Sequence, residues 1–231
     1  MSMVAFHTCY DLVYLYGVAL PWFGGALMDV WRASISWTFL LVAGAMCSLS
    51  RDNLKRALRY LALALAIFAV TSLAAVDDPI SFGIIFCMGA STLVYAGLER
   101  AGVAPAGWPA AALLTLAFVL LLGLPYGKVG IGPLALDVPR APYECGLLSW
   151  LGFPGPSFVS GDYYPLLPYC LLYLAGAAAW RTWGHWLGSA LAHLRCKPLE
   201  LVGQHPLVIY VVHQPLVLGV LWCLSRLGVV G

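Results

Sequence analysis

The sequence has few charged residues. Of its 231 residues, 10% are Asp, Glu, Lys or Arg, whereas a soluble domain carries roughly 25%. Hydrophobic residues make up 62%, and a chain of this length cannot bury so many and still present a polar surface to water. The shortage of charge, with a mean hydropathy of +0.88, excludes an ordinary water-soluble domain and indicates an integral membrane protein.

Two further absences exclude other classes of protein. The net charge is only +2, so there is no basic surface of the kind that binds nucleic acid. The seven cysteines are dispersed and form no Cys-x-x-Cys pair, so we expect neither a metal site nor a disulfide framework.

What the chain does have is a series of apolar windows close to the roughly 20 residues that a helix needs to cross a bilayer. Seven windows run over residues 1–20, 33–50, 60–76, 79–98, 101–127, 163–180 and 201–225. Windows of this length are unlike the strands of an outer-membrane barrel. We therefore predict an all-α polytopic transmembrane helix bundle of seven spans, forming a single domain over residues 1–231.

Basic residues predict the orientation, because Lys and Arg accumulate in cytoplasmic loops. With a cytoplasmic N-terminus and alternating spans, the inside loops hold eight basic residues: Arg51, Lys55, Arg56, Arg59, Arg100, Arg181, Arg195 and Lys197. The outside segments hold four: Arg32, Lys128, Arg140 and Arg226. The bias predicts that the N-terminus is inside and the C-terminus outside.

Ionisable groups within a span are costly and need a partner or a purpose. His7 and Asp11 are four residues apart, on one face of the first predicted helix. A carboxylate one turn from an imidazole can accept its N–H and raise its basicity, which predicts a general base with its orienting acid. The alternative is a polar pair that only holds helices together.

His213 lies within the last predicted span and is followed by Gln214 and Pro215. Proline removes a backbone N–H and frees a carbonyl one turn earlier, and such a helix is tolerated at membrane depth only against protein or a wet cavity. We therefore expect His213 to face the interior. His213 is then either a catalytic residue or a residue that forms hydrogen bonds between helices.

Two other polar segments have two interpretations each. The run Arg51, Lys55, Arg56 and Arg59 either anchors the topology or binds the phosphates of a carrier, with Ser50 and Asn53 as further donors. Asp162 opens the sixth span, where a carboxylate can cap a helix or hold an amine or hydroxyl substrate.

Four motifs resemble those of bacterial relatives of heparan-alpha-glucosaminide N-acetyltransferase. Residues 7–12 are similar to the first-helix H-x-x-Y-D-L, and Gly44 with residues 48–59 is similar to the G-then-S…N-x-x-R stretch. Residues 162–168 resemble D-Y-F-P-L-L-P, and residues 203–215 resemble the ending G-x-x-S-L-x-I-Y-x-x-H-Q-P. The family's Asp…Arg-Gly stretch before the first-helix His is not matched, so we expect either an upstream start or a form without that part of the site.

The resemblance implies a membrane acyltransferase that moves an acyl group, acetyl above all, from acyl-CoA at the cytoplasmic face to an acceptor at the outer face. The acceptor would be an amine or hydroxyl of a sugar or envelope glycan, and the location a bacterial cytoplasmic membrane. Carried over by position, the catalytic residues would be His7, Asp11 and His213. Substrate would bind at Asp162, Tyr163, Tyr210 and Gln214, and acyl-CoA at Ser50, Arg51, Asn53 and Arg56.

Two other functions fit the same residues. Intramembrane His and Asp groups also form proton relays, so a proton-coupled small-molecule transporter is the alternative. A non-catalytic assembly partner is a third hypothesis, in which the polar pair only joins helices. Nothing in the sequence predicts an oligomeric state.

Overall fold

The structure is a computed structural model that describes residues 1–74, 78–191 and 196–230. Arg195, which contributed to the predicted orientation, and Val76, at the end of the third predicted span, lie outside the described residues. The described part is mostly helical, as predicted. It divides into two compact units: unit 1 is Met1–Trp37 with Gly188–Gly231, and unit 2 is Thr38–Leu187.

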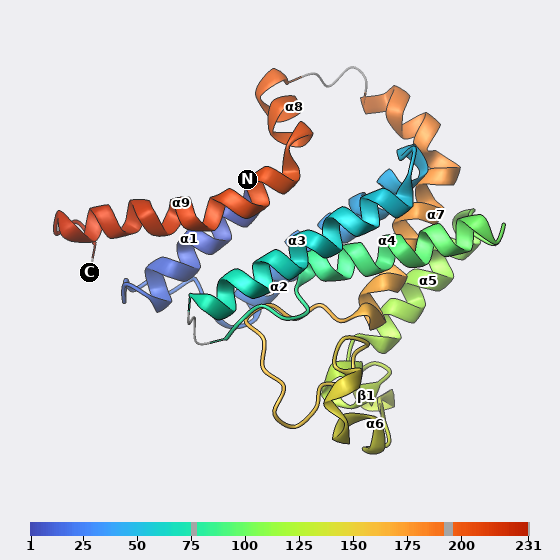
Figure 1. Ribbon diagram of the computed structural model, residues 1–231, viewed down its shortest axis with the longest axis horizontal. Coiled ribbons are helices and arrows are strands. Elements are labelled where there is room, and N and C mark those ends of the chain that lie inside the picture. Colours follow the sequence, from blue (N-terminus) through green and yellow to red (C-terminus); the bar gives the residue numbers. More distant parts are fainter. Residues whose placement is uncertain (75–77, 192–195, 231) are drawn as a thin grey trace. The chain divides into compact units, whose positions relative to one another are not determined.

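Unit 1 contains α1 (Ser2–Tyr14), the first part of α2 (Gly25–Ala45), α8 (Lys197–Gln204) and α9 (Pro206–Arg226). α1 packs along α9 (Figure 1). α1 also supplies Phe6, whose ring lies 5.5 Å from that of Phe23 and 5.4 Å from that of Trp31. α9 begins at Pro206, because a proline in the first helical turn loses no hydrogen bond, and it continues through Pro215.

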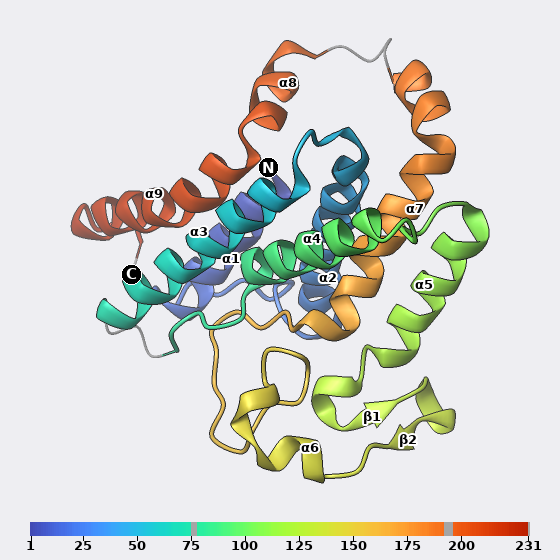
Figure 2. The same ribbon diagram turned by 45° about the vertical axis from the view of Figure 1, so that its right-hand side comes forward.

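Unit 2 contains the rest of α2, η1 (Met46–Leu49), α3 (Asn53–Leu73), α4 (Ile84–Arg100), α5 (Trp108–Leu121) and most of α7 (Leu166–Leu191). α3 and α4 run side by side over much of their length (Figure 1, Figure 2). Asp52 caps α3 by accepting the Lys55 backbone N–H at 2.9 Å. This bond holds the pKa of the Asp52 carboxyl below its ordinary value.

Glycines allow α2 and α7 to pack closely within unit 2. A Cβ added to Gly44 of α2 would overlap the carbonyl oxygen of Tyr173 in α7. A Cβ added to Gly176 of α7 would overlap the carbonyl oxygen of Leu41 in α2. The two backbones are therefore in contact, as is typical of membrane helices that meet through small residues.

The connection between α5 and α7 folds into short elements at one end of unit 2 (Figure 2). β1 (Lys128–Val129) and β2 (Leu136–Asp137) form an antiparallel pair in which Lys128 faces Asp137. The remaining elements are η2 (Leu124–Tyr126), η3 (Gly132–Leu134), α6 (Ala141–Glu144) and η4 (Gly146–Leu148).

Within the described residues, four segments are long and apolar enough to cross a membrane: Gly25–Leu49, Asn53–Leu73, Trp108–Tyr126 and Pro206–Arg226. Much of their apolar surface is exposed, including Leu65, Val70 and Leu73 on α3. Exposed apolar surface on this scale marks a membrane-facing protein. The first predicted span, 1–20, contains only the 13 residues of α1, which reach about 20 Å.

The helix boundaries differ from the predicted windows for physical reasons. The second window began after Arg32, yet α2 begins at Gly25 and continues through Asp29 and Arg32, which form an exposed ion pair on its surface. The fifth and seventh windows begin too early. The helix α5 begins at Trp108, directly before Pro109, and α9 begins at Pro206. Windows defined by hydropathy alone do not locate these caps and turns.

Candidate functional site

The Asp11 carboxylate of α1 is bound by Gln214 of α9. It is 2% exposed and accepts hydrogen bonds from Gln214 Nε2 at 2.9 Å through Oδ2 and at 3.2 Å through Oδ1. The predicted His7–Asp11 hydrogen bond is not found among the described residues, although the two side chains share one helix. A buried carboxylate is costly without donors, and here α9 supplies them.

His213 of α9 has one ring nitrogen engaged and one unpartnered. Its Nδ1 lies 2.7 Å from the Tyr210 carbonyl oxygen and 3.1 Å from that of Ile209. Its Nε2 is buried and has no hydrogen-bond partner among the described residues. The side chain faces inward, 8% exposed, as the sequence predicted.

His7 lies next to His213, so unit 1 brings the three predicted catalytic residues together. The two imidazole centroids are 5.0 Å apart at an interplanar angle of 58°. His213 also interacts electrostatically with Asp11. Tyr210 packs beside His213, with ring centroids 5.9 Å apart. Gln214 Oε1, like His213 Nε2, is a buried acceptor without a partner in the described part of the chain.

This arrangement has the groups that proton transfer needs. It holds two imidazoles in contact, one buried carboxylate near them, and two buried acceptors that a bound N–H or O–H donor would satisfy. Buried polar atoms left unpaired are uncommon in folded proteins, and these two acceptors are open to a bound donor.

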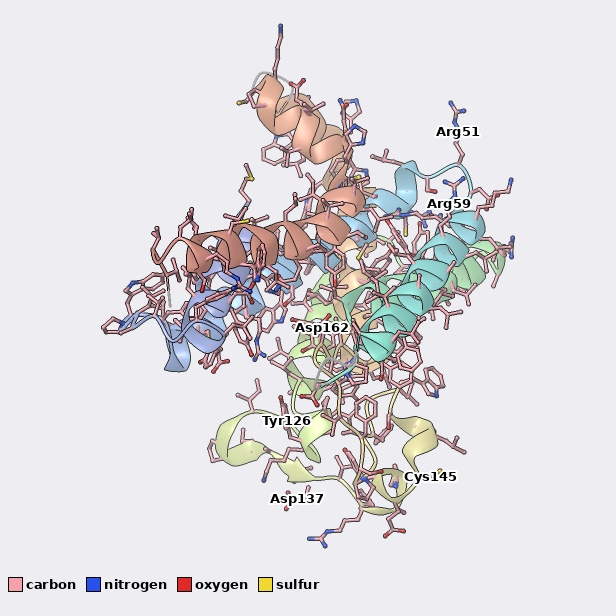
Figure 3. All side chains as sticks on the ribbon, turned by 60° about the vertical axis from the view of Figure 1, so that its left-hand side comes forward. Arg51, Arg59, Tyr126, Asp137, Cys145 and Asp162 are labelled. Atoms are coloured by element: carbon pink, nitrogen blue, oxygen red, sulfur yellow. The ribbon has the colours of Figure 1, made fainter. Side chains whose placement is uncertain are left out.

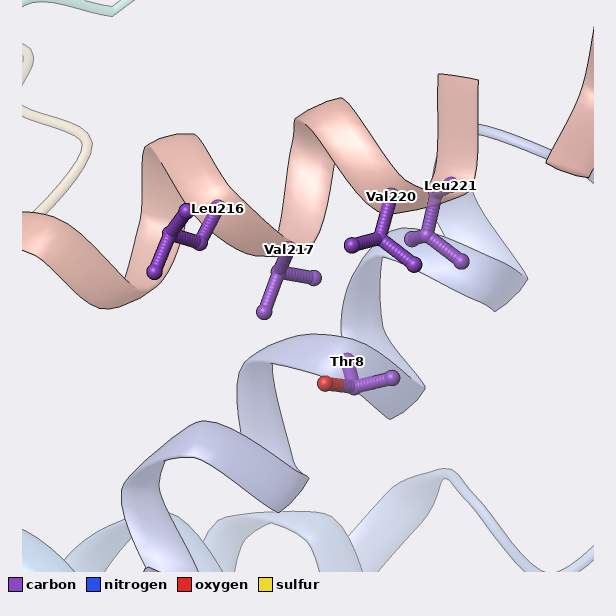
Figure 4. A pocket seen from close by; sticks show the side chains of 5 residues that line it. All are labelled: Thr8, Leu216, Val217, Val220 and Leu221. Carbon is purple, nitrogen blue, oxygen red and sulfur yellow. The ribbon is translucent and has the colours of Figure 1, made fainter. Parts of the chain in front are cut away.

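An apolar groove lies between α1 and α9 (Figure 4). It is lined by Thr8, which follows His7, and by Leu216, Val217, Val220 and Leu221 of α9. The Thr8 hydroxyl donates to the Val4 carbonyl of its own helix at 2.9 Å. The groove therefore offers hydrocarbon, not a polar contact, to whatever occupies it.

Asp162 and Tyr163, the predicted substrate residues of unit 2, make local structural contacts. Asp162 Oδ2 accepts the backbone N–H of Ile84 at 3.0 Å, so it caps α4, a helix far from it in sequence. The Tyr163 hydroxyl donates to the Ser149 carbonyl at 2.6 Å. Helix capping was one of the two interpretations of Asp162, and the sequence could not identify α4 as the helix that is capped.

The predicted acyl-CoA residues lie at the junction of α2 and α3. Asn53 Nδ2 donates to the Cys47 carbonyl and to Glu99, both at 3.1 Å, while its Oδ1 is buried and unpartnered among the described residues. Arg56 donates to the Ala43 carbonyl at 3.0 Å. It therefore meets the C-terminal end of α2, where a cation is favourable.

Ser50 lies between η1 and α3 and is half-buried, whereas Arg51 is exposed. Arg51 and Arg59 lie at the end of unit 2 that is opposite Asp137 and Cys145 (Figure 3). Arg51 is thus exposed, while Asn53 and Arg56 are engaged by backbone carbonyls and by the side chains of Glu99, Tyr60 and Cys47.

A buried polar cluster around Tyr173 of α7 was not predicted from the sequence. Its hydroxyl lies 2.6 Å from Thr92 Oγ1 and 3.1 Å from Cys47 Sγ, and Arg56 lies 3.9 Å from the same sulfur. Cys47, Thr92 and Tyr173 come from three separate helices and follow no spacing rule. The one available signal was a set of polar side chains inside apolar windows.

The described residues contain no group of three or more His, Cys, Asp or Glu side chains that could hold a metal ion. Comparison with known proteins identifies a family. A family model described as heparan-alpha-glucosaminide N-acetyltransferase, catalytic, matches residues 1–215. Searches among curated proteins and among solved structures found no match. The match covers the four motifs and most of the chain, so the chain belongs to the heparan-alpha-glucosaminide N-acetyltransferase catalytic family, a family of membrane acetyltransferases.

Proposed function

We propose that the chain transfers an acyl group, usually acetyl, from acyl-CoA at the cytoplasmic face of a bacterial cytoplasmic membrane to an acceptor at the outer face. The acceptor is an amine or hydroxyl of a sugar or envelope glycan. Family membership supports the reaction class. Neither the donor nor the acceptor is identified by the match, and both are part of the proposal.

The observation that supports this function best is His213 Nε2, which lies beside His7 and is buried without a partner in the described part of the chain. An acceptor N–H or O–H bound there can give up its proton as its lone pair attacks the thioester carbonyl. Because the site lies away from water, each hydrogen-bond donor to the developing oxyanion has a larger effect. His7, Asp11 and His213 are the proposed catalytic residues, with Tyr210 and Gln214 contacting the substrate.

The proposed topology has seven spans, a cytoplasmic N-terminus and an external C-terminus, with the whole chain acting as one domain. Each of the seven predicted windows overlaps a helix, and four described segments are long and apolar enough to span a membrane. The opposite placement of Arg51 and Cys145 in unit 2 (Figure 3) supports the assignment of their loops to opposite faces. Ser50, Arg51, Asn53 and Arg56 would then meet acyl-CoA inside, and Asp162 and Tyr163 would border the acceptor entrance outside.

The test uses purified protein in liposomes, radiolabelled acetyl-CoA, and glucosamine or a cell-envelope extract as the acceptor. We expect labelled product from the wild type and a 10²- to 10⁴-fold lower rate from His213→Ala and Asp11→Asn, the usual range for a lost acid–base group. His185→Ala, which alters an exposed histidine of α7, is the matched control. Equal labelling by all four proteins contradicts the proposed site.

The same liposomes test the transporter alternative. A proton-coupled transporter exchanges labelled solute across the membrane without acetylating it, so counterflow of glucosamine in the absence of acetyl-CoA would favour that function. Acetyl transfer without counterflow favours the acyltransferase.

A further inference from the structure

The hydrogen bonds of His213 determine which of its nitrogens carries the proton. A backbone carbonyl can only accept, so Nδ1, at 2.7 Å from the Tyr210 carbonyl and 3.1 Å from that of Ile209, must be the donor. In a neutral imidazole the other nitrogen then carries the lone pair. Nε2 is therefore a free acceptor, and it is buried without a donor among the described residues.

His7 has no comparable anchor in the described part of the chain. The carboxylate that could orient it, Asp11, is held by both of its oxygens to Gln214. What His7 does have is contact with the His213 ring at 5.0 Å. A hydrogen bond that orients the imidazole was predicted between His7 and Asp11. In the structure His213 has such a bond, with the Tyr210 carbonyl as its acceptor.

We propose that His213 Nε2, not His7, is the proton acceptor of this site, an inference that rests on the proposed acyltransferase function. Asp11 then acts through its charge, because it interacts electrostatically with His213 and stabilises the imidazolium that forms. Gln214 is a positioning residue that holds Asp11 in place. The groups that face His213 are His7 and Asp11 from α1 and Tyr210 from its own helix.

The transfer step balances with no further reactant. The acceptor's N–H or O–H donates its proton to His213 Nε2 as the acceptor's lone pair forms a bond to the thioester carbonyl carbon. The carbon–sulfur bond of the resulting tetrahedral intermediate breaks, and the coenzyme A thiolate takes the proton back from Nε2. His213 ends neutral, with Nδ1–H still on the Tyr210 carbonyl.

The test relies on the shape of the Asn side chain, whose amide N–H can replace Nδ1–H but which has nothing at the position of Nε2. His213→Asn should keep the bond to Tyr210 and melt within a few degrees of the wild type, yet transfer acetyl from acetyl-CoA to glucosamine at least 100-fold more slowly. His7→Asn is measured alongside. In ¹⁵N-histidine NMR of the detergent-solubilised wild type, the signal that His213→Asn removes should be the Nδ1–H tautomer.

Three results overturn the inference while leaving the proposed function in place. They are transfer by His213→Asn within threefold of wild type, loss of transfer in His7→Asn alone, and an Nε2–H tautomer at His213. A wild type that acetylates neither glucosamine nor an envelope extract instead contradicts the proposed function, and the base role is rejected with it. Slow transfer by a stably folded His213→Asn, together with the Nδ1–H tautomer in the wild type, confirms His213 Nε2 as the proton acceptor.

Discussion

At the scale of single residues, the polar side chains of unit 2 contribute to stability by satisfying backbone groups. Asp162 accepts the first N–H of α4 from a point 78 residues away in sequence. A helix leaves its first N–H groups without intrahelical partners, and a capping side chain restores one of these bonds. Such a contact can be tested without any substrate.

Asp162→Ala should lower the free energy of unfolding by about 1 kcal/mol, the usual cost of a lost cap. Asp162→Asn keeps an acceptor oxygen and should lose less than half as much. Thermal unfolding in detergent measures both. Asp137→Ala, which removes an exposed ion pair with Lys128, is the control and should change stability by less than about 0.5 kcal/mol. An equal loss in all three variants would reject the capping role.

A second prediction at the residue scale concerns the contribution of the Tyr173 hydroxyl to stability. Tyr173→Phe removes the hydroxyl that bonds Thr92 and Cys47 in a fully buried position. We expect a loss of about 1–3 kcal/mol, because a buried partner is left with fewer bonds. Tyr126→Phe, at an 83% exposed position, should be neutral. A neutral Tyr173→Phe would mean that the cluster around it contributes nothing to stability.

At the scale of elements, the contact between α2 and α7 depends on two glycines. Gly44 and Gly176 each leave no room for a Cβ, because a backbone carbonyl of the other helix occupies that space. Backbone cannot move aside as a flexible side chain can. The two helices must therefore separate if either glycine is replaced.

Gly44→Ala and Gly176→Ala should each destabilise the protein by about 1–3 kcal/mol, the typical cost of overpacking. Gly97→Ala in α4 is the matched control, since a Cβ there meets nothing within 4 Å and alanine is the better helix former by about 1 kcal/mol. Unfolding by denaturant of the three variants measures the difference. Opposite signs for the two kinds of site are expected, and a common sign would contradict the close contact.

Helix positions could be predicted from the sequence, and helix ends could not. Long apolar windows indicate helices wherever they occur, and α3, α5 and α9 lie within or across such windows. The ends depend on single interactions, such as the cap that Asp52 provides for α3 or the cap that Asp162 provides for α4. The second of these joins distant segments and leaves no local pattern.

The candidate site shows the same division. His7, Asp11 and His213 could be selected because ionisable groups are rare at membrane depth. Their hydrogen-bond partners could not be predicted. The i, i+4 spacing indicated a His7–Asp11 bond, whereas Asp11 accepts from Gln214, 203 residues away in sequence. The tautomer of His213 depends on the Tyr210 and Ile209 carbonyls, whose position follows only from the helix geometry.

At the scale of the whole molecule, two exposed native cysteines test the proposed topology. Cys145 lies in the connection between α5 and α7, and Cys196 precedes α8. A membrane-impermeant maleimide applied to sealed right-side-out cells should label Cys145 and leave Cys196 unlabelled until the membrane is opened. Cys145→Ser and Cys196→Ser identify each signal. Labelling of both in sealed cells, or of Cys196 alone, contradicts an N-in, C-out bundle of seven spans.

The cap on α4 also has a consequence in time. Its donor and acceptor are separated by 78 residues, and ribosomes add roughly 5–20 residues per second, so Ile84 is made about 4–16 s before Asp162. During that interval the first turn of α4 depends on water or on the insertion machinery for a hydrogen bond that the finished protein provides itself. Synthesis of the loop between α5 and α7 therefore completes a helix that was made long before it.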